Sequence, residues 1–247
     1  SALLSNCDVL FSPGNIAPII KSTKIKSQWV ATIGPFDQNV YEGLSYWGRI
    51  FLAINKLLML ASMRTSNIII HESKYSQNFF IKEYKLKKEN NYLIECGRSD
   101  FFFPVYERND VSNKFIKDMR STDFLCVSHL YPYKNLETLI TAFSSYLTAT
   151  KKDHVRLFIC GMPVFEEYYQ KLLGHVESSG CCDNIIFVGN VSQADLRYAY
   201  STCRFMVFPS LCESSGYTLI EAMSCGAAII TTKLTAMPFT CGEAASY

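Results

Sequence analysis

Short apolar runs alternate along the chain with longer stretches in which apolar residues recur at helical spacing. In the first half, these patterns predict strands at 8–12, 29–33, 67–71 and 92–95 and helices at 46–63 and 75–82. The apolar runs are continuous rather than alternating, which is typical of strands buried on both faces. The pattern therefore predicts an α/β fold in which parallel sheets are covered by helices.

The same rhythm recurs more regularly after a polar stretch at 104–120. It predicts strands at 124–128, 155–160, 185–188, 205–209 and 228–232 and helices at 135–146, 165–177, 193–201 and 217–225. We place a domain boundary in the polar stretch, which divides the chain into domains at 1–118 and 119–247.

Composition removes several classes of function. The formal net charge is only +2, and the 24 basic residues are spread along the whole length, so a nucleic-acid partner is not expected. The ten cysteines and four histidines show no ligand-like spacing, so we expect reduced thiols and no zinc site. The chain opens without Met and shows no signal peptide, and we expect a cytoplasmic fragment of a longer protein.

The longest apolar stretch, residues 47–63, is shorter than the roughly 20 residues that span a bilayer. It contains Arg49 and Lys56, so a membrane-spanning helix is not predicted. Its aromatic and leucine content is compatible with a helix lying in the membrane interface, at the inner face of a membrane. The alternative, a core helix, is favoured.

The segment 208–226 carries the clearest chemistry, because a predicted strand end runs through a turn of small residues into a helix. Ligands of open α/β sheets bind at this carboxyl edge. Ser214, Ser215 and Gly216 let backbone N–H groups approach an anion closely, and the start of the helix adds donors and a positive partial charge. The segment therefore predicts a phosphate site.

Two carboxylates, Glu213 and Glu221, frame this turn. An ionised carboxylate only accepts hydrogen bonds, so Glu221 suits the hydroxyls of a ribose and Glu213 those of a group beyond the phosphates. A single glutamate early in a helix usually complements the helix dipole, but the spaced pair around Gly216 favours ligand binding. Lys134, in a second loop at the same predicted edge, is either a cation for a diphosphate or a solvated surface lysine.

The stretches 127–143, 184–190 and 208–242 and the Gly161 turn together resemble the family 4 retaining glycosyltransferases. The family's Glu-x7-Glu pair corresponds to Glu213 and Glu221, and its Lys-Asn position corresponds to Lys134 and Asn135. The resemblance implies a GT-B fold with two Rossmann-like domains. It covers about two thirds of a typical member, so we expect an incomplete acceptor-side domain at 1–118 and a donor domain truncated at its C-terminal end at 119–247.

The resemblance also implies residue roles for a nucleotide-sugar donor. Glu213 and Lys134 are the catalytic candidates, with Glu213 at the sugar and Lys134 at the diphosphate, and Glu221 holds the ribose. The backbone around the helix start cradles the diphosphate, and the remaining donor-side candidates lie on neighbouring loops; these residues are Gly216, Tyr217, Thr218, Leu219, Val191 at the base, Gly161 and His129.

Two parts of the chain depart from the family pattern. His129 stands where many relatives carry an arginine, and it is either a hydrogen-bond donor to the diphosphate or a loop histidine without a role. The first domain is a fainter match. In it, Asn15 and Asp37 are either acceptor-side polar residues or simple turn residues beside prolines.

The sequence contains no Asp-x-Asp triplet, so we expect transfer without a metal or other cofactor. The implied reaction moves a sugar, with retention, to a glycan or lipid-linked acceptor. The alternative is a module that binds a nucleotide sugar or a protein partner without turnover. A dinucleotide oxidoreductase is excluded, since neither half opens with the Gly-x-Gly-x-x-Gly turn.

Overall fold

The computed structural model describes residues 7–19 and 25–247. The chain divides into two compact units. Unit 1 contains the residues up to Cys96 together with Cys212–Ser215, and unit 2 contains Gly97–Leu211 and Gly216–Tyr247. Each unit is built on a parallel sheet, so the predicted α/β class is confirmed. The domain limits predicted at 118 and 119 stay a prediction.

Unit 2 contains a six-stranded sheet in the order β10-β9-β8-β5-β6-β7, and every pair in it is parallel. Its strands are β5 (Phe124–Val127), β6 (Leu157–Cys160), β7 (Ile185–Gly189), β8 (Phe205–Phe208), β9 (Ile229–Thr231) and β10 (Ala245–Ser246). Its helices are α4 (Lys114–Lys117), α5 (Leu136–Thr150), α6 (Glu166–Ser179), α7 (Gln193–Thr202), α8 (Tyr217–Ser224) and α9 (Met237–Cys241), with 3-10 turns η4 (Pro132–Lys134) and η5 (Gly242–Ala244).

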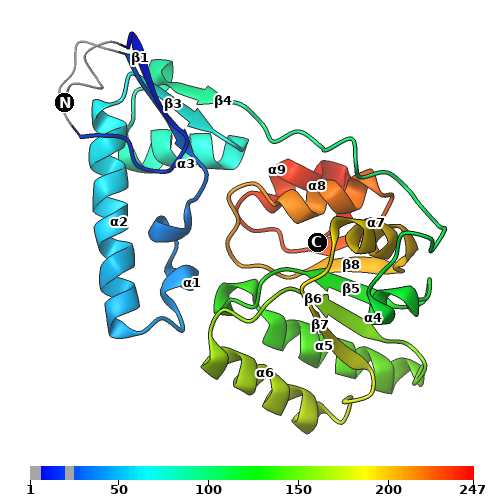
Figure 1. The fold of residues 1–247 in the computed structure, drawn as a ribbon. Coiled ribbons are helices and arrows are strands. Elements are labelled where there is room, and N and C mark those ends of the chain that lie inside the picture. The colour runs from blue at the N-terminus through cyan, green and yellow to red at the C-terminus, as the bar shows by residue number, and fades with distance from the viewer. Residues whose placement is uncertain (1–6, 20–24) are drawn as a thin grey trace. The chain divides into compact units, whose positions relative to one another are not determined.

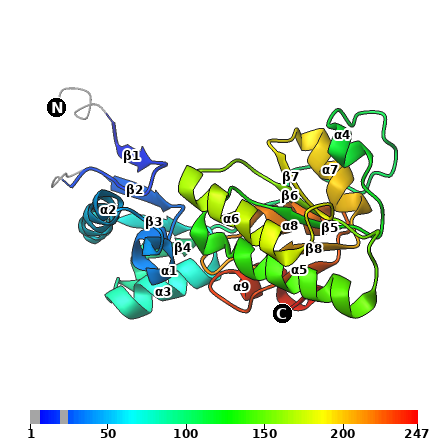
Figure 2. The same ribbon diagram turned by 90° about the horizontal axis from the view of Figure 1, so that it is seen from below.

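Helices cover both faces of this sheet, because the strand order reverses direction. The chain moves outward through β5, β6 and β7 and then returns to the other side of β5 at β8. Right-handed crossovers therefore place α5 and α6 on one face and α7 and α8 on the other, as Figures 1 and 2 show. Two separate apolar clusters fill the two layers. The prediction of strands buried on both faces is confirmed for the central strands β5 and β6, whereas β7 and β10 at the sheet edges are only partly buried.

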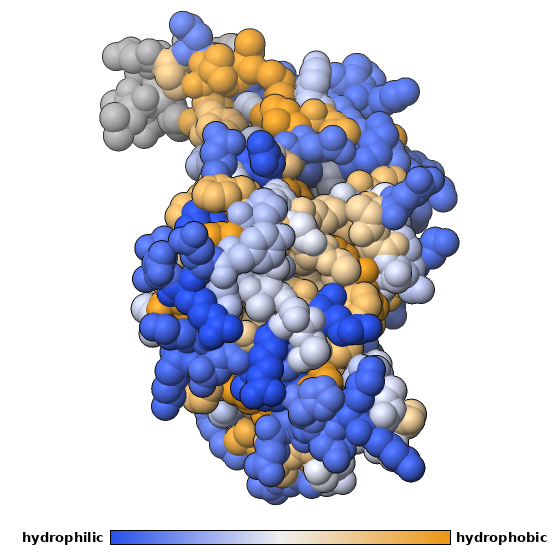
Figure 3. All heavy atoms as spheres, turned by 90° about the vertical axis from the view of Figure 1, so that its right-hand side faces the viewer, coloured by the Kyte–Doolittle hydropathy of each residue, from blue (hydrophilic) through white to orange (hydrophobic). Residues whose placement is uncertain are grey.

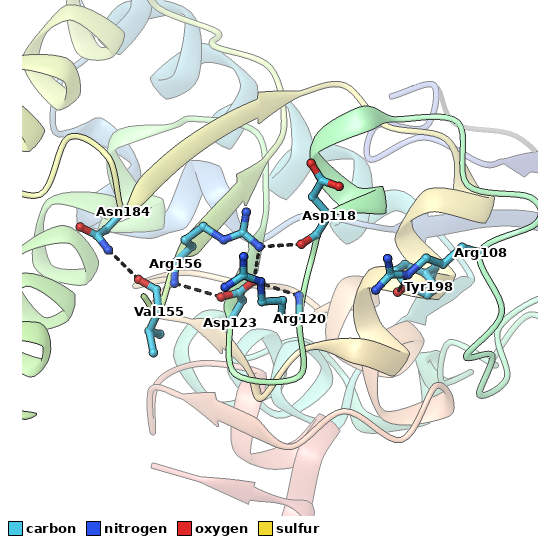
Figure 4. A network of polar contacts seen from close by, with 8 residues as sticks. All are labelled: Arg108, Asp118, Arg120, Asp123, Val155, Arg156, Asn184 and Tyr198. Carbon is cyan, nitrogen blue, oxygen red and sulfur yellow. Dashed lines mark hydrogen bonds and ion pairs between the residues drawn. The ribbon is translucent and has the colours of Figure 1, made fainter. Parts of the chain in front are cut away.

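The amino ends of β5 and β6 are joined by a polar network around Asp123 (Figure 4). The Asp123 carboxylate is fully buried and lies 2.8 Å from an Arg156 Nη. It also accepts hydrogen bonds from the backbone N–H groups of Arg120 and Arg156. This network satisfies the buried charge and fixes the edge of the sheet opposite to the predicted phosphate site.

Unit 1 contains a parallel four-stranded sheet in the order β1-β2-β3-β4. The strands are β1 (Val9–Ser12), β2 (Ile25–Val30), β3 (Ile68–His71) and β4 (Asn91–Leu93). The helices are α1 (Gln38–Tyr41), α2 (Tyr46–Thr65) and α3 (Lys74–Tyr84), with 3-10 turns η2 (Gly34–Phe36) and η3 (Lys88–Asn90).

The two long helices of unit 1 cover one face of its sheet. Buried side chains on that face hydrogen-bond to the helices: Ser62 of α2 donates to Gln28, and Ser76 of α3 lies 3.2 Å from a His71 ring nitrogen. On the other face, register places Val9 beside Ile25, and about half of the surface of Val9, Phe11 and Ile25 is exposed. In Figure 3, orange spheres gather near the top of the view, whereas hydrophilic and hydrophobic residues are mixed over the rest.

The strand predicted at 29–33 was placed wrongly, because β2 runs from Ile25 to Val30. The first half of β2 is polar in sequence yet buried, because Lys26 and Gln28 have hydrogen-bond partners inside unit 1. Lys26 Nζ donates to the Pro18 carbonyl. The Gln28 side chain accepts from Ser62 of α2 and from Ser66, the C-cap residue of α2. Helix α5 also extends four residues beyond its predicted end, and hydroxyls such as Thr150 bond carbonyls four residues earlier.

Candidate functional site

The centre of the unit 2 sheet is where its topology changes direction. Strands β5 and β8 are neighbours, but the chain leaves β5 toward α5 on one face and leaves β8 toward α8 on the other. The carboxyl ends of such a strand pair flank a crevice in which open α/β sheets bind ligands. The loops that follow β5 and β8 contain the predicted residues Lys134 and Gly216.

Hydrogen bonds join these two loops. The N–H of Leu211, after β8, donates to the carbonyl of Tyr133, after β5, at 2.8 Å. The Asn135 side-chain amide donates to the Pro209 carbonyl at 3.4 Å. Asn135 has the left-handed conformation with a φ of 59°, which small polar residues tolerate, and α5 begins directly after it. The loop therefore has a defined shape at the switch point.

Lys134 lies over aromatic rings at this edge. Its ammonium is 5.2 Å from the centroid of Phe208, the last residue of β8, and 5.1 Å from that of Tyr133. Both contacts fall within the range of cation–π attraction, so the charge is held near the carboxyl end of β8. The interpretation of Lys134 as a solvated surface lysine is disfavoured, because its side chain is partly buried.

Gly161 allows the ends of β5 and β6 to approach closely. Its φ is +143°, and a Cβ atom there would lie 1.9 Å from the carbonyl oxygen of Ser128. Directly beside it, the N–H of Met162 donates to Nδ1 of His129 at 3.2 Å. Because a backbone N–H can only donate, Nδ1 is the acceptor and the neutral ring carries its proton on Nε2. His129 is exposed, so this Nε2–H is a donor at the carboxyl edge without protonation of the ring.

Helix α8 begins at Tyr217, immediately after Gly216, whose φ of 74° is left-handed. Leu219 is fully buried, so its side chain anchors the first turn in the core and only its backbone faces the edge. The N–H groups of Leu219 and Ile220 donate to the Gly216 carbonyl, at 2.9 Å and 3.4 Å. The start of α8, including Thr218, places the positive end of the helix dipole at the carboxyl edge of the sheet. Its role as an anion site stays a prediction.

Glu221 lies in the second turn of α8 and is partly buried. Its Oε2 atom accepts a hydrogen bond of 3.2 Å from the hydroxyl of Tyr200, which belongs to α7 and is fully buried. Burial raises the pKa of Glu221, and the Tyr200 hydrogen bond opposes that rise. Burial and the nearby Glu221 charge raise the pKa of Tyr200 well above its usual value, so Tyr200 stays protonated and donates. Sequence reasoning missed Tyr200, because in sequence it is one more aromatic residue on an amphipathic helix.

The remaining candidates divide between the two units. Glu213 is partly buried and lies in the four-residue segment that groups with unit 1. In unit 1, the Asn15 side chain accepts from the N–H groups of Ala31 and Thr32, and Asp37 caps α1. Both contacts match the turn-residue interpretation. Val191 follows β7 in unit 2 and packs partly buried against the core.

Among residues 7–19 and 25–247, no three His, Cys, Asp or Glu side chains are arranged to hold a metal ion. In the same described ranges, no helix combines the length and apolar character needed to cross a bilayer.

Comparison with known proteins identifies the family. The model of the family "Glycosyl transferases group 1" matches residues 107–241, which is more than half of the chain. The serotype-specific mannosyltransferase WbdA of Escherichia coli is 34% identical over 119 residues, which are 48% of this chain and 14% of that protein.

Solved structures show the same fold at low identity. WaaG, a glycosyltransferase of lipopolysaccharide biosynthesis, superposes with a TM-score of 0.72 at 14% identity, over 97% of this chain and 63% of that one. Anabaena HepE in complex with UDP-glucose gives 0.66 at 18% identity, over 86% and 54%. The chain spans less than two thirds of each of these proteins. The two parallel sheets, the structural similarity and the family match agree. The chain therefore belongs to the glycosyl transferases group 1 family and has the GT-B fold.

Proposed function

We propose that this chain binds a nucleotide-diphosphate sugar and acts in a retaining, metal-independent transfer of the sugar to a glycan or lipid-linked acceptor. One observation carries the proposal: a lysine, a helix start and a carboxylate follow the carboxyl ends of β5 and β8, the strands that flank the switch point. Lys134 and the start of α8 provide positive charge, and Glu221 provides a hydrogen-bond acceptor.

The groups in unit 2 match the parts of such a donor. Lys134 carries the positive charge that a diphosphate requires, and the backbone from Gly216 to Leu219, at the positive end of the helix dipole, cradles the diphosphate. Glu221 accepts from the two hydroxyls of the ribose, while Val191 flanks the base.

Three further residues complete the proposed donor site. The Nε2–H of His129 supplies a neutral donor in place of a second cation, and Gly161 lets the ends of β5 and β6 approach closely beside it. Glu213, which follows β8 one turn before α8, takes the hydroxyls of the sugar. For Asn15 and Asp37 of unit 1, we propose a second role at the acceptor, in addition to the backbone contacts described above.

The proposed chemistry places stabilising charge where charge develops. As the bond between the sugar and the diphosphate breaks, negative charge grows on the leaving phosphate beside Lys134 and the α8 start. The acceptor hydroxyl attacks from the same face, and its proton passes to the departing phosphate oxygen. Retention follows from same-face attack without a covalent sugar–enzyme intermediate.

Similar proteins support the donor class. HepE is described in complex with UDP-glucose, and WbdA is a mannosyltransferase by name. The first fact supports a nucleotide sugar as the donor of this chain, and the second supports sugar transfer as its reaction.

The surface of α2 supports a lipid-linked acceptor at a membrane. The interpretation of α2 as a core helix is wrong for its outer side, where 75% of Trp47 and 68% of Phe51 are exposed. The 20 residues of α2 include three cations, Arg49, Lys56 and Arg64, and no acidic residue. Aromatic side chains beside cations suit an anionic membrane interface. We propose peripheral contact with the inner face of a membrane, in the cytoplasm.

A thermal-shift panel of UDP- and GDP-sugars tests the donor proposal. A ligand present at 100 times its dissociation constant adds about 2.7 kcal/mol to the stability of the protein. We expect a shift with one nucleotide class, and a clearly smaller shift in Glu221→Ala. Glu177→Ala, at the exposed end of α6, is the control and keeps the full shift. Release of nucleoside diphosphate then separates an enzyme from a module that only binds. An undiminished shift in Glu221→Ala refutes the ribose role.

A further inference from the structure

Tyr200 places a hydroxyl group in an apolar part of the core, where packing requires only its aromatic ring. Its side chain is fully buried in the apolar cluster between the sheet and helices α7 and α8. The ring packs edge-on against Phe102, with centroids 6.1 Å apart. A phenylalanine would fill the same volume, and burying a hydroxyl opposes folding unless the hydroxyl finds a partner.

The partner of this hydroxyl is Glu221. The distance from the Tyr200 oxygen to Glu221 Oε2 is 3.2 Å, and the two residues come from adjacent helices that start at the same edge of the sheet. A glutamate on a short helix has several accessible rotamers. A donor fixed in the core selects one of them, because the tyrosine ring cannot move without disturbing its neighbours.

The contact leaves the carboxylate able to bind a ligand. A carboxylate has about four lone-pair sites, and Tyr200 occupies one of those on Oε2. The hydrogen bond also opposes the effect of burial on the pKa of Glu221, so it favours the ionised, acceptor-only form.

We propose that Tyr200 is a positioning residue, which holds the Glu221 carboxylate in the orientation that accepts the 2′- and 3′-hydroxyls of the donor ribose. This inference rests on the proposed ribose role of Glu221. It predicts that Tyr200 acts on ribose recognition through Glu221 and makes no contact with the ligand itself.

The test compares Tyr200→Phe with a matched control on the same helix. Tyr198 is also buried in this cluster, but its hydroxyl bonds Arg108 at 2.7 Å, so Tyr198→Phe removes an equivalent group away from Glu221. Dissociation constants are measured by calorimetry for UDP and GDP and for their 2′-deoxy counterparts. The readout is the preference for ribose over deoxyribose, which a general loss of stability does not change.

In the wild type, a hydroxyl bonded to an ionised carboxylate should give a ribose preference of roughly 10-fold or more. We expect Tyr200→Phe to lower that preference about 3- to 10-fold and Tyr198→Phe to change it less than about 2-fold. In a Glu221→Ala background, Tyr200→Phe should have no further effect on the preference, since the two residues act as one unit.

The outcomes separate the two proposals. If the wild type binds none of the four nucleotides, the proposed function fails, and the role of Tyr200 fails with it. If the wild type prefers ribose and Tyr200→Phe keeps that preference, only the positioning role is overturned. Equal weakening of ribose and deoxyribose binding in Tyr200→Phe also overturns it, because that result describes a structural residue.

Discussion

Replacing Gly161 by alanine should disturb the candidate site through the backbone alone. Gly161 follows β6 with a φ of +143°, a conformation that residues with a Cβ rarely adopt. An added Cβ would lie 1.9 Å from the Ser128 carbonyl oxygen and 2.5 Å from its carbon. Both are backbone atoms at the end of β5, so no flexible side chain can swing away to make room.

The structure indicates the size of the effect. Real Cβ atoms essentially never approach other atoms closer than 3.0 Å, so β5 and β6 must separate locally by about 1 Å. The strained φ costs about 1–3 kcal/mol, and the overpacking costs a similar amount, about 1–3 kcal/mol. We therefore expect Gly161→Ala to destabilise unit 2 by about 2–6 kcal/mol, which lowers its Tm by roughly 4–24 °C at about 2–4 °C per kcal/mol.

Gly174 provides the matched control. It lies within α6, and a Cβ there meets nothing within 4 Å. Gly174→Ala should stabilise the helix by about 0.5–1 kcal/mol, because alanine loses less backbone entropy on folding. Thermal unfolding followed by circular dichroism measures both variants. A Gly161→Ala protein with the Tm of the wild type would refute the close approach of β5 and β6.

Three other predictions concern charge and exposed surface. Burial raises the pKa of Glu221 above its unfolded value, so the ionised form opposes folding at neutral pH. Glu221→Gln should therefore raise the Tm at pH 7, and the gain should shrink as the pH falls through the folded pKa toward 4.5. An equal gain at all pH values would contradict this sign. Asp123→Ala removes a fully buried carboxylate that pairs with Arg156 and accepts from the backbone N–H groups of Arg120 and Arg156, and should destabilise by about 3–5 kcal/mol in urea unfolding. A loss under about 1 kcal/mol would show this network to be unimportant. Exchanging Trp47 and Phe51 for serine should reduce co-sedimentation with anionic vesicles, and absence of binding by the wild type would remove the proposed membrane contact.

The order of strands and helices in unit 2 could be predicted from the sequence, because its central strands are buried on both faces and appear as continuous apolar runs. The buried run at Leu157–Cys160 is a clear example. The same reasoning failed at β2, where Lys26 and Gln28 are buried and polar. Their burial depends on partners from other elements, which a pattern of single residues does not contain. Short helices such as α4 were missed for a related reason, since four residues give no helical period.

Those parts of the candidate site that require a glycine in the backbone could be predicted from the sequence. Gly161 and Gly216 both have positive φ, and each marks a turn at the carboxyl edge. The orientation of His129 was not predictable, because its tautomer follows from the Met162 N–H, a contact between two loops. Tyr200 was missed because nothing in the sequence separates a core tyrosine that bonds a candidate ligand-binding carboxylate from one that does not.

The neighbouring positions of β5 and β8 also bear on how the protein is made. Between these strands the chain forms β6, β7 and helices α5, α6 and α7, so the two halves of the proposed donor site are synthesised at different times. A nascent chain that ends before β8 contains Lys134 but lacks Phe208 and the start of α8. The proposed donor site is therefore complete only once β8 lies beside β5.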